Sequence, residues 1–298
     1  MKFFVTGSTG YIGTAVVAAL VKAGHQVTGL VHNSEKEALL KSLGATPLLG
    51  GLEAVNPWKD KAAQHEAVLH LGFAKEGNPA DIDKKVVETL LPALQGGGVT
   101  QSFVYTSGVW VLGNTQGKSA DESSSTDKAF AMVAWRPVVE QIVLKSSSRQ
   151  LATAIIRPGL VYGGKSGILA MMWGGVLKDG AATTVGDGQN HWPMVHRDDL
   201  AQLYRLVAEK RATGVFHGVD GVAVKYAEVA QTVSQAAGKG GSVKAWPLEE
   251  ARKAMGLFAE ALTLDQMVAA KRPAELGWKC SHGSFAASAA QAFKEFQA

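Results

Sequence analysis

Residues 2–13 read KFFVTGSTGYIG, and the rest of the chain is interpreted outward from them. A short apolar run leads into glycines at positions 7, 10 and 13, and an amphipathic segment follows that Gly24 closes. This order predicts a strand, a glycine turn and a helix. Gly7 would make the tight turn, Gly10 would admit phosphates to the backbone, and Gly13 would let the helix pack closely. The pattern predicts a dinucleotide-binding turn; the alternative is a purely structural glycine-rich turn.

The composition is that of a globular protein. With 298 residues, 46% of them hydrophobic, the chain can form one large domain or a domain with an appendage. No apolar run reaches the roughly 18 residues of a membrane span, and the first expected strand leaves no room for a signal peptide. Cys280 is the single cysteine, which favours a reducing compartment, so we expect a cytoplasmic protein. The net charge of +4 is scattered, which argues against nucleic acid as a partner.

Strand-like and helix-like segments alternate through the first half of the chain. We expect strands at 25–31, 45–49, 67–71 and 102–106, and helices at 35–43 and 81–94, the latter stopped by the glycines at 96–98. This alternation predicts an α/β fold with a doubly wound, Rossmann-type parallel sheet. The polar, serine-rich segment 117–128 is expected to be a mobile surface loop, either a lid or a solvated connection.

The second half has a less regular pattern. Helices are expected around 137–146, 166–178, 198–207, 226–237 and 284–296, with strands at 153–157 and 215–217. We predict a dinucleotide-binding core over residues 1–165. Residues 166–298 would form mostly a small substrate-binding lobe, with some segments returning to the core. Open α/β sheets hold ligands at the carboxyl edge of the sheet, so we expect the lobe at that edge.

Six pieces of the sequence, in this order, resemble the extended or atypical short-chain dehydrogenases/reductases, which include NAD(P)-dependent epimerases and dehydratases. The pieces are TGSTGYIG (6–13), LHLGFA (69–74), FVYTSGVWVLG (103–113), IRPGLVYGG (156–164), WPMVHRDDLAQLY (192–204) and ELGWK (275–279). The resemblance implies a nicotinamide cofactor along the carboxyl ends of the strands. The cofactor-binding residues expected on this basis are Gly7, Thr9, Gly10, Tyr11, Ile12, Gly13, His32, Asn33, Ser34, Leu71, Gly72, Phe73, Thr106, Arg136, Pro158 and Gly159.

The acid–base pair typical of this family is replaced. Relatives carry a Tyr and a Lys four residues apart, with a Ser from the strand before them. Here the Tyr position falls on Met132, the Lys position on Arg136 and the Ser position on Gly108, and no Tyr-x-x-x-Lys occurs anywhere in the chain. A thioether carries no proton and a guanidinium stays protonated, so this pair cannot exchange protons at neutral pH. Arg136 can still bond the ribose diol; the alternative is a solvated surface cation.

The end of the second strand bears on the choice of cofactor. NAD-binding proteins place an Asp or Glu there to bond the ribose 2′-hydroxyl. Here Val31 holds that position, followed by His32, Asn33 and Ser34, with Lys36 nearby. Nothing there repels a 2′-phosphate, and His32 stands where related NADP-binding proteins often carry Arg. We therefore predict NADP(H) in preference to NAD(H); the alternative for His32 is an exposed loop residue.

Proton transfer needs a group other than the missing Tyr. The first candidates are Ser107, at the end of a strand whose tip approaches the nicotinamide in this family, and Tyr162, which has a titratable hydroxyl. His191 is a third candidate, since imidazole titrates near neutrality. The alternatives are a backbone hydrogen-bonding Ser, a packed ring and a loop histidine. Ser107, Tyr162 and Arg136 are the predicted catalytic residues.

Large apolar side chains gather in the segments expected to border the substrate. They predict an apolar small-molecule substrate, with core packing as the alternative. The predicted substrate-binding residues are Trp110, Met132, Trp135, Tyr162, Trp173, His191 and Trp192. We expect no metal site, because Cys280 and His282 are expected to form an isolated pair without further ligands nearby.

These observations predict an NADP(H)-dependent oxidoreductase that reduces a carbonyl, imine or activated double bond of an apolar small molecule. Two other functions stay open. The missing Tyr and Lys favour a non-catalytic NAD(P)-binding redox sensor or regulator, and the family also includes epimerases and lyases that use bound NAD(P). A monomer and a homodimer are both possible: relatives often pair through two helices, and Pro137 falls inside one of them.

Overall fold

The computed structural model describes residues 1–96 and 100–298, and the chain divides into two compact units. Unit 1 comprises Met1–Ser107, Trp135–Arg157 and Ala201–Phe216; unit 2 comprises Gly108–Ala134, Pro158–Leu200 and His217–Ala298. Gly97 and Gly98, expected to help stop a helix, lie outside the described residues. The division differs from the expected boundary at 165, because 108–134 belongs to unit 2. By this division, unit 2 is about as large as unit 1.

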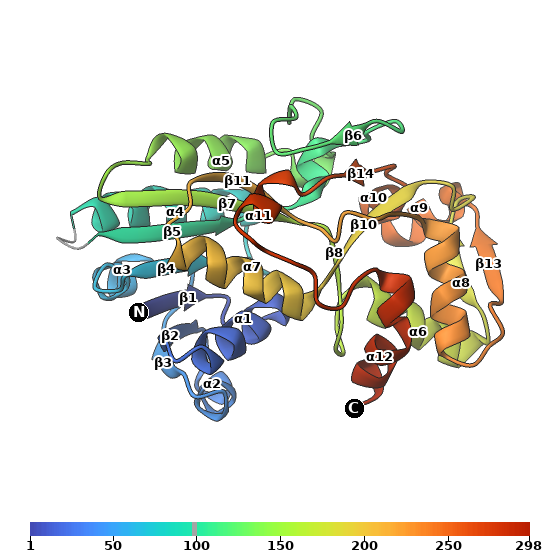
Figure 1. Ribbon diagram of the computed structural model, residues 1–298, viewed down its shortest axis with the longest axis horizontal. Coiled ribbons are helices and arrows are strands. Elements are labelled where there is room, and N and C mark those ends of the chain that lie inside the picture. Colours follow the sequence, from blue (N-terminus) through green and yellow to red (C-terminus); the bar gives the residue numbers. More distant parts are fainter. Residues whose placement is uncertain (97–99) are drawn as a thin grey trace. The chain divides into compact units, whose positions relative to one another are not determined.

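Unit 1 is built on a seven-stranded sheet in the order β11-β7-β5-β4-β1-β2-β3 (Figure 1). From β7 to β3, all neighbouring strands pair in parallel, which confirms the predicted Rossmann-type sheet. The inner strands are almost wholly buried, as expected for a parallel sheet covered on both faces. The strands are Lys2–Thr6 (β1), Gln26–Val31 (β2), Thr46–Leu49 (β3), Ala67–His70 (β4), Gln101–Thr106 (β5), Leu151–Pro158 (β7) and Gly214–Gly218 (β11).

Helices cover both faces of this sheet. One face carries α3, α4 and α5, whose apolar side chains share a core with β1, β4, β5 and β7; α1 and α7 lie on the other side in Figure 1. The helices are Tyr11–Lys22 (α1), Glu37–Ser42 (α2), Asn56–Ala62 (α3), Pro79–Gln95 (α4), Arg136–Lys145 (α5) and Arg197–Glu209 (α7). The sequence pattern did not predict α3, and the helix expected at 35–43 is divided into a 3-10 turn, Ser34–Lys36 (η1), and α2.

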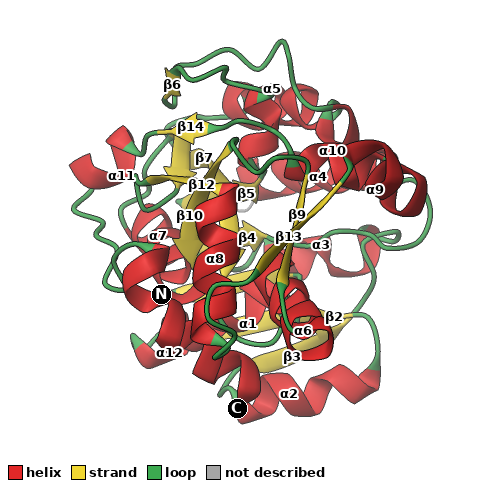
Figure 2. Ribbon diagram, turned by 90° about the vertical axis from the view of Figure 1, so that its right-hand side faces the viewer, coloured by secondary structure: helices red, strands yellow, loops and turns green. Residues whose placement is uncertain are grey.

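Unit 2 combines short strands with helices. Its strands are Ser119–Ala120 (β6), Leu160–Tyr162 (β8), Ala182–Val185 (β9), His191–His196 (β10), Ala223–Lys225 (β12), Val243–Trp246 (β13) and Met267–Val268 (β14). Its helices are Val109–Leu112 (η2), Ala131–Val133 (η3), Ile168–Asp179 (α6), Tyr226–Ala236 (α8), Leu248–Met255 (α9), Leu257–Leu262 (α10), Lys271–Glu275 (α11) and Phe285–Gln297 (α12). In Figure 2, α6 and α8 lie beside the β9–β13 pair. Across residues 1–96 and 100–298, no helix has the length and apolar character needed to cross a bilayer.

The segment 117–128 is more ordered than its composition predicts. Within it, β6 pairs in parallel with β14. Asp121 accepts a hydrogen bond from Lys271 at 2.6 Å, and the Gly117 N–H donates to Asp265 at 2.8 Å. The segment is therefore a surface connection that residues 265 and 271 hold at two points. The anchoring residues lie about 150 positions away along the chain, where local composition gives no information about them.

Candidate functional site

The glycine turn joins β1 directly to α1. The Gly10 N–H donates to the Gly7 carbonyl at 2.9 Å, and Gly7 has a φ of +65°, a conformation that favours glycine. A Cβ on Gly7 would lie 2.6 Å from the Leu71 carbonyl, and one on Gly13 would lie 2.0 Å from the Gly7 oxygen. Backbone therefore touches backbone at both positions. Gly10, at the start of α1, is exposed, so the amino end of this helix is accessible to an anion.

A cavity of about 360 Å³ lies beside the turn, within unit 1. It is bordered by residues of the turn and by residues at or just beyond the carboxyl ends of β2, β3 and β4. Ligands of open α/β sheets bind at this edge. The lining residues are Gly7, Thr9, Leu30, His32, Gly50, Gly51, Leu52, Glu53, Gly72, Phe73, Ala74, Lys75 and Glu76. The glycine cradle and the cavity together fit the phosphates and one end of a dinucleotide.

Sequence reasoning found only part of this lining. Of the predicted cofactor-binding residues, Gly7, Thr9, His32, Gly72 and Phe73 line the cavity. Residues 50–53 and 74–76 were missed, although β3 lies next to β2 and its end must reach the same edge of the sheet. The Asn33 side chain has a local role instead, because its Oδ1 accepts from the Lys36 N–H at the start of η1.

Arg136, at the start of α5, reaches the end of β5. Its Nη1 donates to the Thr106 carbonyl at 2.6 Å and to the Tyr105 hydroxyl at 3.4 Å. The guanidinium lies 4.7 Å from the centre of the Trp135 ring. Among the described residues, Nε and Nη2 have no hydrogen-bond partner. Arg136 is thus held at the tip of β5, with N–H groups left for a ligand.

Ser107 follows β5 directly, and its hydroxyl is buried without a hydrogen-bond partner among the described residues, like those of Ser102 and Thr153. Its N–H donates to the Ile156 carbonyl at 2.8 Å, which fixes the backbone. The residue is 7% exposed, and its hydroxyl has no partner among the residues that the structure describes. Buried hydroxyls are almost always hydrogen-bonded. An orphan hydroxyl next to Thr106 is consistent with a group that a ligand completes.

Tyr162 lies in the core of unit 2. Its hydroxyl is 2.8 Å from the Ser288 Oγ, and its ring packs edge-on against Phe285 and His196. The side chain has no exposed surface, and this burial raises the pKa of the Tyr162 hydroxyl well above its ordinary value. A hydroxyl that is buried and already hydrogen-bonded is poorly placed to contact a ligand. The surroundings of Tyr162 are those of a packed core ring, which was the alternative interpretation. Its role as a proton donor stays a prediction.

Two of the tryptophans expected to border the substrate are core residues. Trp173 and Trp192 are 0% and 1% exposed. The Trp173 indole donates to the Val233 carbonyl at 3.2 Å, and Trp192 stacks on Tyr226 with ring centres 3.8 Å apart. Their rings present no surface to a substrate, so core packing accounts for both.

The remaining predicted substrate residues keep some exposed surface. Met132 is 41% exposed, and Trp110 and Trp135 are partly exposed. His191 is engaged, because its Nδ1 and its backbone N both lie 2.8 Å from Asp265 Oδ1. Burial acts against ionisation of Asp265, but these bonds hold its pKa below the ordinary value.

Pro158 and Gly159 mark the change from unit 1 to unit 2. The Gly159 N–H donates to the Gly218 carbonyl at 3.0 Å. A Cβ on Gly159 would lie 2.3 Å from the Pro193 oxygen. Close packing against β10 is therefore enough to require this glycine, whether or not it also contacts a cofactor.

Comparison with known proteins assigns the family. Residues 3–218 match the model of the NAD dependent epimerase/dehydratase family. The chain belongs to this family. Its members are NAD(P)-dependent oxidoreductases and epimerases, and the predicted resemblance and fold class are confirmed.

Similar proteins span most of the chain. It is 31% identical over 289 residues to the uncharacterized protein YLL056C of Saccharomyces cerevisiae, covering 94% of each chain. It is 30% identical over 225 residues to the 2-alkyl-3-oxoalkanoate reductase of Stenotrophomonas maltophilia, covering 72% of this chain and 67% of that one. The crystal structure of human epimerase family protein SDR39U1 (isoform 2) with NADPH has a TM-score of 0.80 over 99% of both chains. At 21% identity, this last likeness shows the shared fold.

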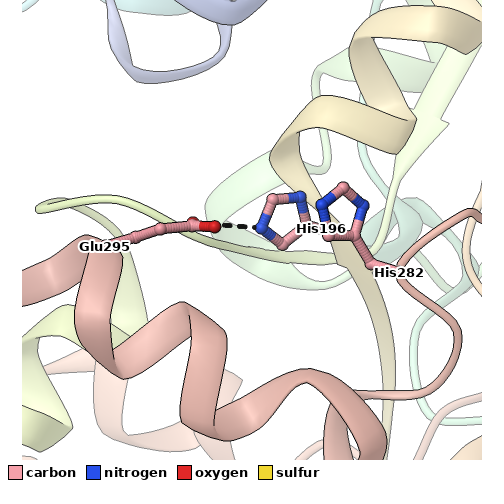
Figure 3. A group of neighbouring side chains, drawn as sticks. All are labelled: His196, His282 and Glu295. Carbon is pink, nitrogen blue, oxygen red and sulfur yellow. Dashed lines mark hydrogen bonds and ion pairs between the residues drawn. The ribbon is translucent and has the colours of Figure 1, made fainter.

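A second polar group lies in unit 2, formed by His196, His282 and Glu295 (Figure 3). His196 Nε2 is 3.2 Å from Glu295 Oε2, and His282 Nδ1 is 3.0 Å from Asp199 Oδ2. His282 therefore does have neighbours of metal-ligand type, and the expectation that it forms an isolated pair with Cys280 is wrong. The neighbours come from positions 196 and 295, so sequence spacing could not reveal them.

The geometry is that of two stacked histidine–carboxylate pairs. The imidazole rings of His196 and His282 lie 3.6 Å apart with an angle of 16° between their planes. Lone pairs in nearly parallel planes do not converge on one ion. The Asp198 N–H donates to His196 Nδ1 at 3.2 Å, which leaves the proton of neutral His196 on Nε2, facing Glu295. Hydrogen bonding alone accounts for this cluster.

This cluster predicts a pH-dependent stability. Burial and the neighbouring His282 lower the pKa of His196, so the folded protein resists a proton that the unfolded chain accepts near its ordinary pKa of about 6.5. The stabilisation is complete above about pH 6.5 and is lost as the pH falls toward the folded pKa. His65 acts in the same direction, and Asp220, whose pKa burial raises to about 6, acts in the opposite one.

When the pH is lowered from about 7.5 to about 5.5, we therefore expect the unfolding free energy of His196→Gln to fall less than that of the wild type. Urea unfolding at each pH measures this difference. The exposed His32 provides the matched control, because His32→Gln should follow the wild-type curve. Equal losses in the wild type and His196→Gln would contradict the assignment.

Proposed function

We propose that this protein is an NADP(H)-dependent oxidoreductase that reduces a carbonyl, imine or activated double bond of an apolar small molecule. The observation that carries the proposal is the cavity beside the glycine turn, with His32 in its wall and Val31 where NAD-specific relatives place an acid. An imidazole at this position accommodates a 2′-phosphate that a carboxylate at the same position would repel. The cavity wall also holds the Lys75 ammonium and the carboxylates of Glu53 and Glu76. When bound, the nicotinamide supplies or accepts the hydride.

The residues at the tip of β5 have complementary roles in this proposal. Arg136 stays protonated, so it binds and orients the ribose through its unpaired N–H groups and does not transfer a proton. The Ser107 hydroxyl, buried and without a partner in the described structure, hydrogen-bonds the reacting oxygen or nitrogen. Tyr162 is the second candidate for this task. Because the Tyr162 hydroxyl is already hydrogen-bonded to Ser288, Ser107 is the stronger candidate.

The substrate class rests on two kinds of support. The relative from Stenotrophomonas maltophilia is named as a reductase of 2-alkyl-3-oxoalkanoates, which carry a ketone beside alkyl groups. In this chain, Met132, Trp110 and Trp135 keep accessible apolar surface. Both favour a lipophilic carbonyl compound over a nucleotide sugar.

The cofactor preference gives a direct test at His32. We expect His32→Asp to raise the Kd for NADPH about tenfold or more, because a carboxylate repels the 2′-phosphate. The Kd for NADH should change much less. His32→Asn is the matched neutral control, and it should raise the Kd for NADPH less than His32→Asp does. Fluorescence titration of the wild type and both variants with each cofactor measures the six Kd values, and equal responses to NADPH and NADH would contradict the preference.

Turnover tests the role of Ser107. With a panel of ketones, enones and imines, we expect Ser107→Ala to lower kcat about 10²- to 10⁴-fold while the Kd for NADPH stays unchanged. Tyr162→Phe, assayed in parallel, distinguishes the two candidates. An unchanged kcat in Ser107→Ala together with a lost kcat in Tyr162→Phe would reverse their roles.

A redox sensor is the second candidate function, favoured by the replacement of the usual Tyr and Lys by Met132 and Arg136. It predicts submicromolar binding of NADPH and no turnover with any compound of the panel. An epimerase or lyase that uses bound NAD(P) predicts product formation without net oxidation of the cofactor. The same panel therefore separates the three functions.

A further inference from the structure

Buried hydrogen bonds connect the cavity wall to α4 in unit 1. The Gly72 N–H, in the wall of the cavity, donates to Thr6 Oγ1 at 3.1 Å. Thr6 Oγ1 lies 2.6 Å from His70 Nδ1, and His70 Nε2 lies 3.1 Å from Asp83 Oδ1. The side chains of His70 and Asp83 are 1% and 8% exposed. One arm of the network thus runs from the cavity to Asp83.

A second arm runs from Asp83 to Arg136. The Tyr105 hydroxyl donates to Asp83 Oδ2 at 2.6 Å. The same hydroxyl oxygen accepts from Arg136 Nη1 at 3.4 Å, and the stronger bond of Nη1, to the Thr106 carbonyl, is 2.6 Å long. The two oxygens of Asp83 therefore hold the ends of two separate arms.

The donors and acceptors available to each side chain fix the direction of the hydrogen bonds in both arms. A carboxylate only accepts, so His70 donates through Nε2. In the tautomer that carries its proton on Nε2, Nδ1 accepts from the Thr6 hydroxyl. Thr6 Oγ1 is then free to accept from Gly72, as observed. On the other side, burial raises the pKa of Tyr105 well above its ordinary value, so Tyr105 stays protonated and donates to Asp83. Every proton along the network points toward Asp83.

Core stability alone does not require this carboxylate. The other buried residues of α4, which include Val86, Val87 and Leu90, are apolar. A buried carboxylate costs free energy unless it is fully hydrogen-bonded, and apolar replacements of such groups are often as stable. The two arms instead end at two places that the proposed function assigns to the cofactor.

We propose that Asp83 is a positioning residue for the dinucleotide. Through His70 and Thr6 it fixes the Gly72 wall of the cavity, and through Tyr105 it fixes the guanidinium of Arg136. Asp83 itself touches no ligand. The inference rests on the proposed function, because it assigns both arms to the binding of NADP(H).

A double-mutant cycle on the Arg136 arm tests this role. We expect Tyr105→Phe to raise the Kd for NADPH about 3- to 10-fold, the loss of one hydrogen-bonded positioning contact. In the Arg136→Met background the same change should have no further effect, since the arm then has nothing to position. A structural role predicts equal effects in both backgrounds, or none. Tyr226→Phe, which removes the partly buried hydrogen bond from the Tyr226 hydroxyl to the Thr183 carbonyl in unit 2, is the matched control and should leave the Kd unchanged.

If Tyr105→Phe does not fold, a second variant still tests the inference. His70→Gln cuts the other arm, so it should raise the Kd for NADPH by a factor that persists in the Arg136→Met background. Additive behaviour of Tyr105→Phe with Arg136→Met, or an unchanged Kd in both Tyr105→Phe and His70→Gln, would overturn the inference while the proposed function stands.

Wild-type protein that binds no NADPH would overturn the proposed function instead. In that case, the NMR signal of the Arg136 guanidinium tests whether Tyr105 holds this group in place. Tyr105→Phe should speed rotation of this group. An unchanged rotation rate would overturn the inference on its own.

Discussion

Gly13→Ala is expected to raise the Kd for NADPH about 100-fold or more, which corresponds to about 2.7 kcal/mol of binding free energy. The new Cβ would lie 2.0 Å from the Gly7 oxygen and 2.8 Å from the Gly7 carbonyl carbon. Because both contacts are to backbone, no side chain can move aside. The first turn of α1 must shift away from the glycine turn, and the N–H groups that face the phosphates shift with it.

Fluorescence titration with NADPH measures this loss, and circular dichroism checks that the variant is folded. Gly174→Ala is the matched control, because a Cβ at Gly174 in α6 meets no atom within 4 Å. It should keep the wild-type Kd and gain up to about 1 kcal/mol of stability, as alanine is the better helix former. A folded Gly13→Ala variant with the wild-type Kd would show that the turn does not hold the cofactor.

Glu140→Ala is expected to lower the unfolding free energy by about 3 to 5 kcal/mol. Glu140 and Arg157 form a two-pronged ion pair, with Nε to Oε1 at 3.0 Å and Nη2 to Oε2 at 2.5 Å. The side chains are 2% and 5% exposed. Removing the carboxylate takes two hydrogen bonds and one opposite charge away from a buried guanidinium, and that penalty exceeds the value of the pair itself.

Urea unfolding measures this loss. Glu37 provides the control, since it pairs with Lys41 on the surface of α2 at 3.1 Å. Glu37→Ala should cost less than about 1 kcal/mol, because exposed pairs contribute little. Equal costs for the two variants would mean that the Glu140 pair is hydrated in solution.

The elements with strong local signals were predicted well. The turn before α1 needs a glycine at Gly7, and helical spacing behind Asp198 and Asp199 predicted α7. The contacts that the sequence did not reveal lie where distant segments meet. The segment 117–128 is held by residues 265–271, and the neighbours of His282 come from two other segments.

The sequence predicted the glycine turn of the candidate site correctly. It did not predict which residues surround an individual side chain. His32 directly follows β2, and Phe73 lies three residues after the end of β4; both line the cavity, and the sequence pattern shows about where these two strands end. Whether a given ring faces a ligand or the core depends on packing partners. Tyr162 carries the same hydroxyl in either setting, and only its contacts with Ser288 and Phe285 distinguish the two.

Reading the residues alone was enough to establish the βα crossing and the absence of a Tyr-x-x-x-Lys pair, because both depend on neighbours within a few positions. The three-dimensional arrangement was needed to learn that Thr6, His70, Asp83, Tyr105 and Arg136 share one hydrogen-bonded network. These residues meet because β1, β4 and β5 are adjacent in the sheet while α4 and α5 lie over the same face. Strand order is a property of the folded chain, and no local pattern encodes it.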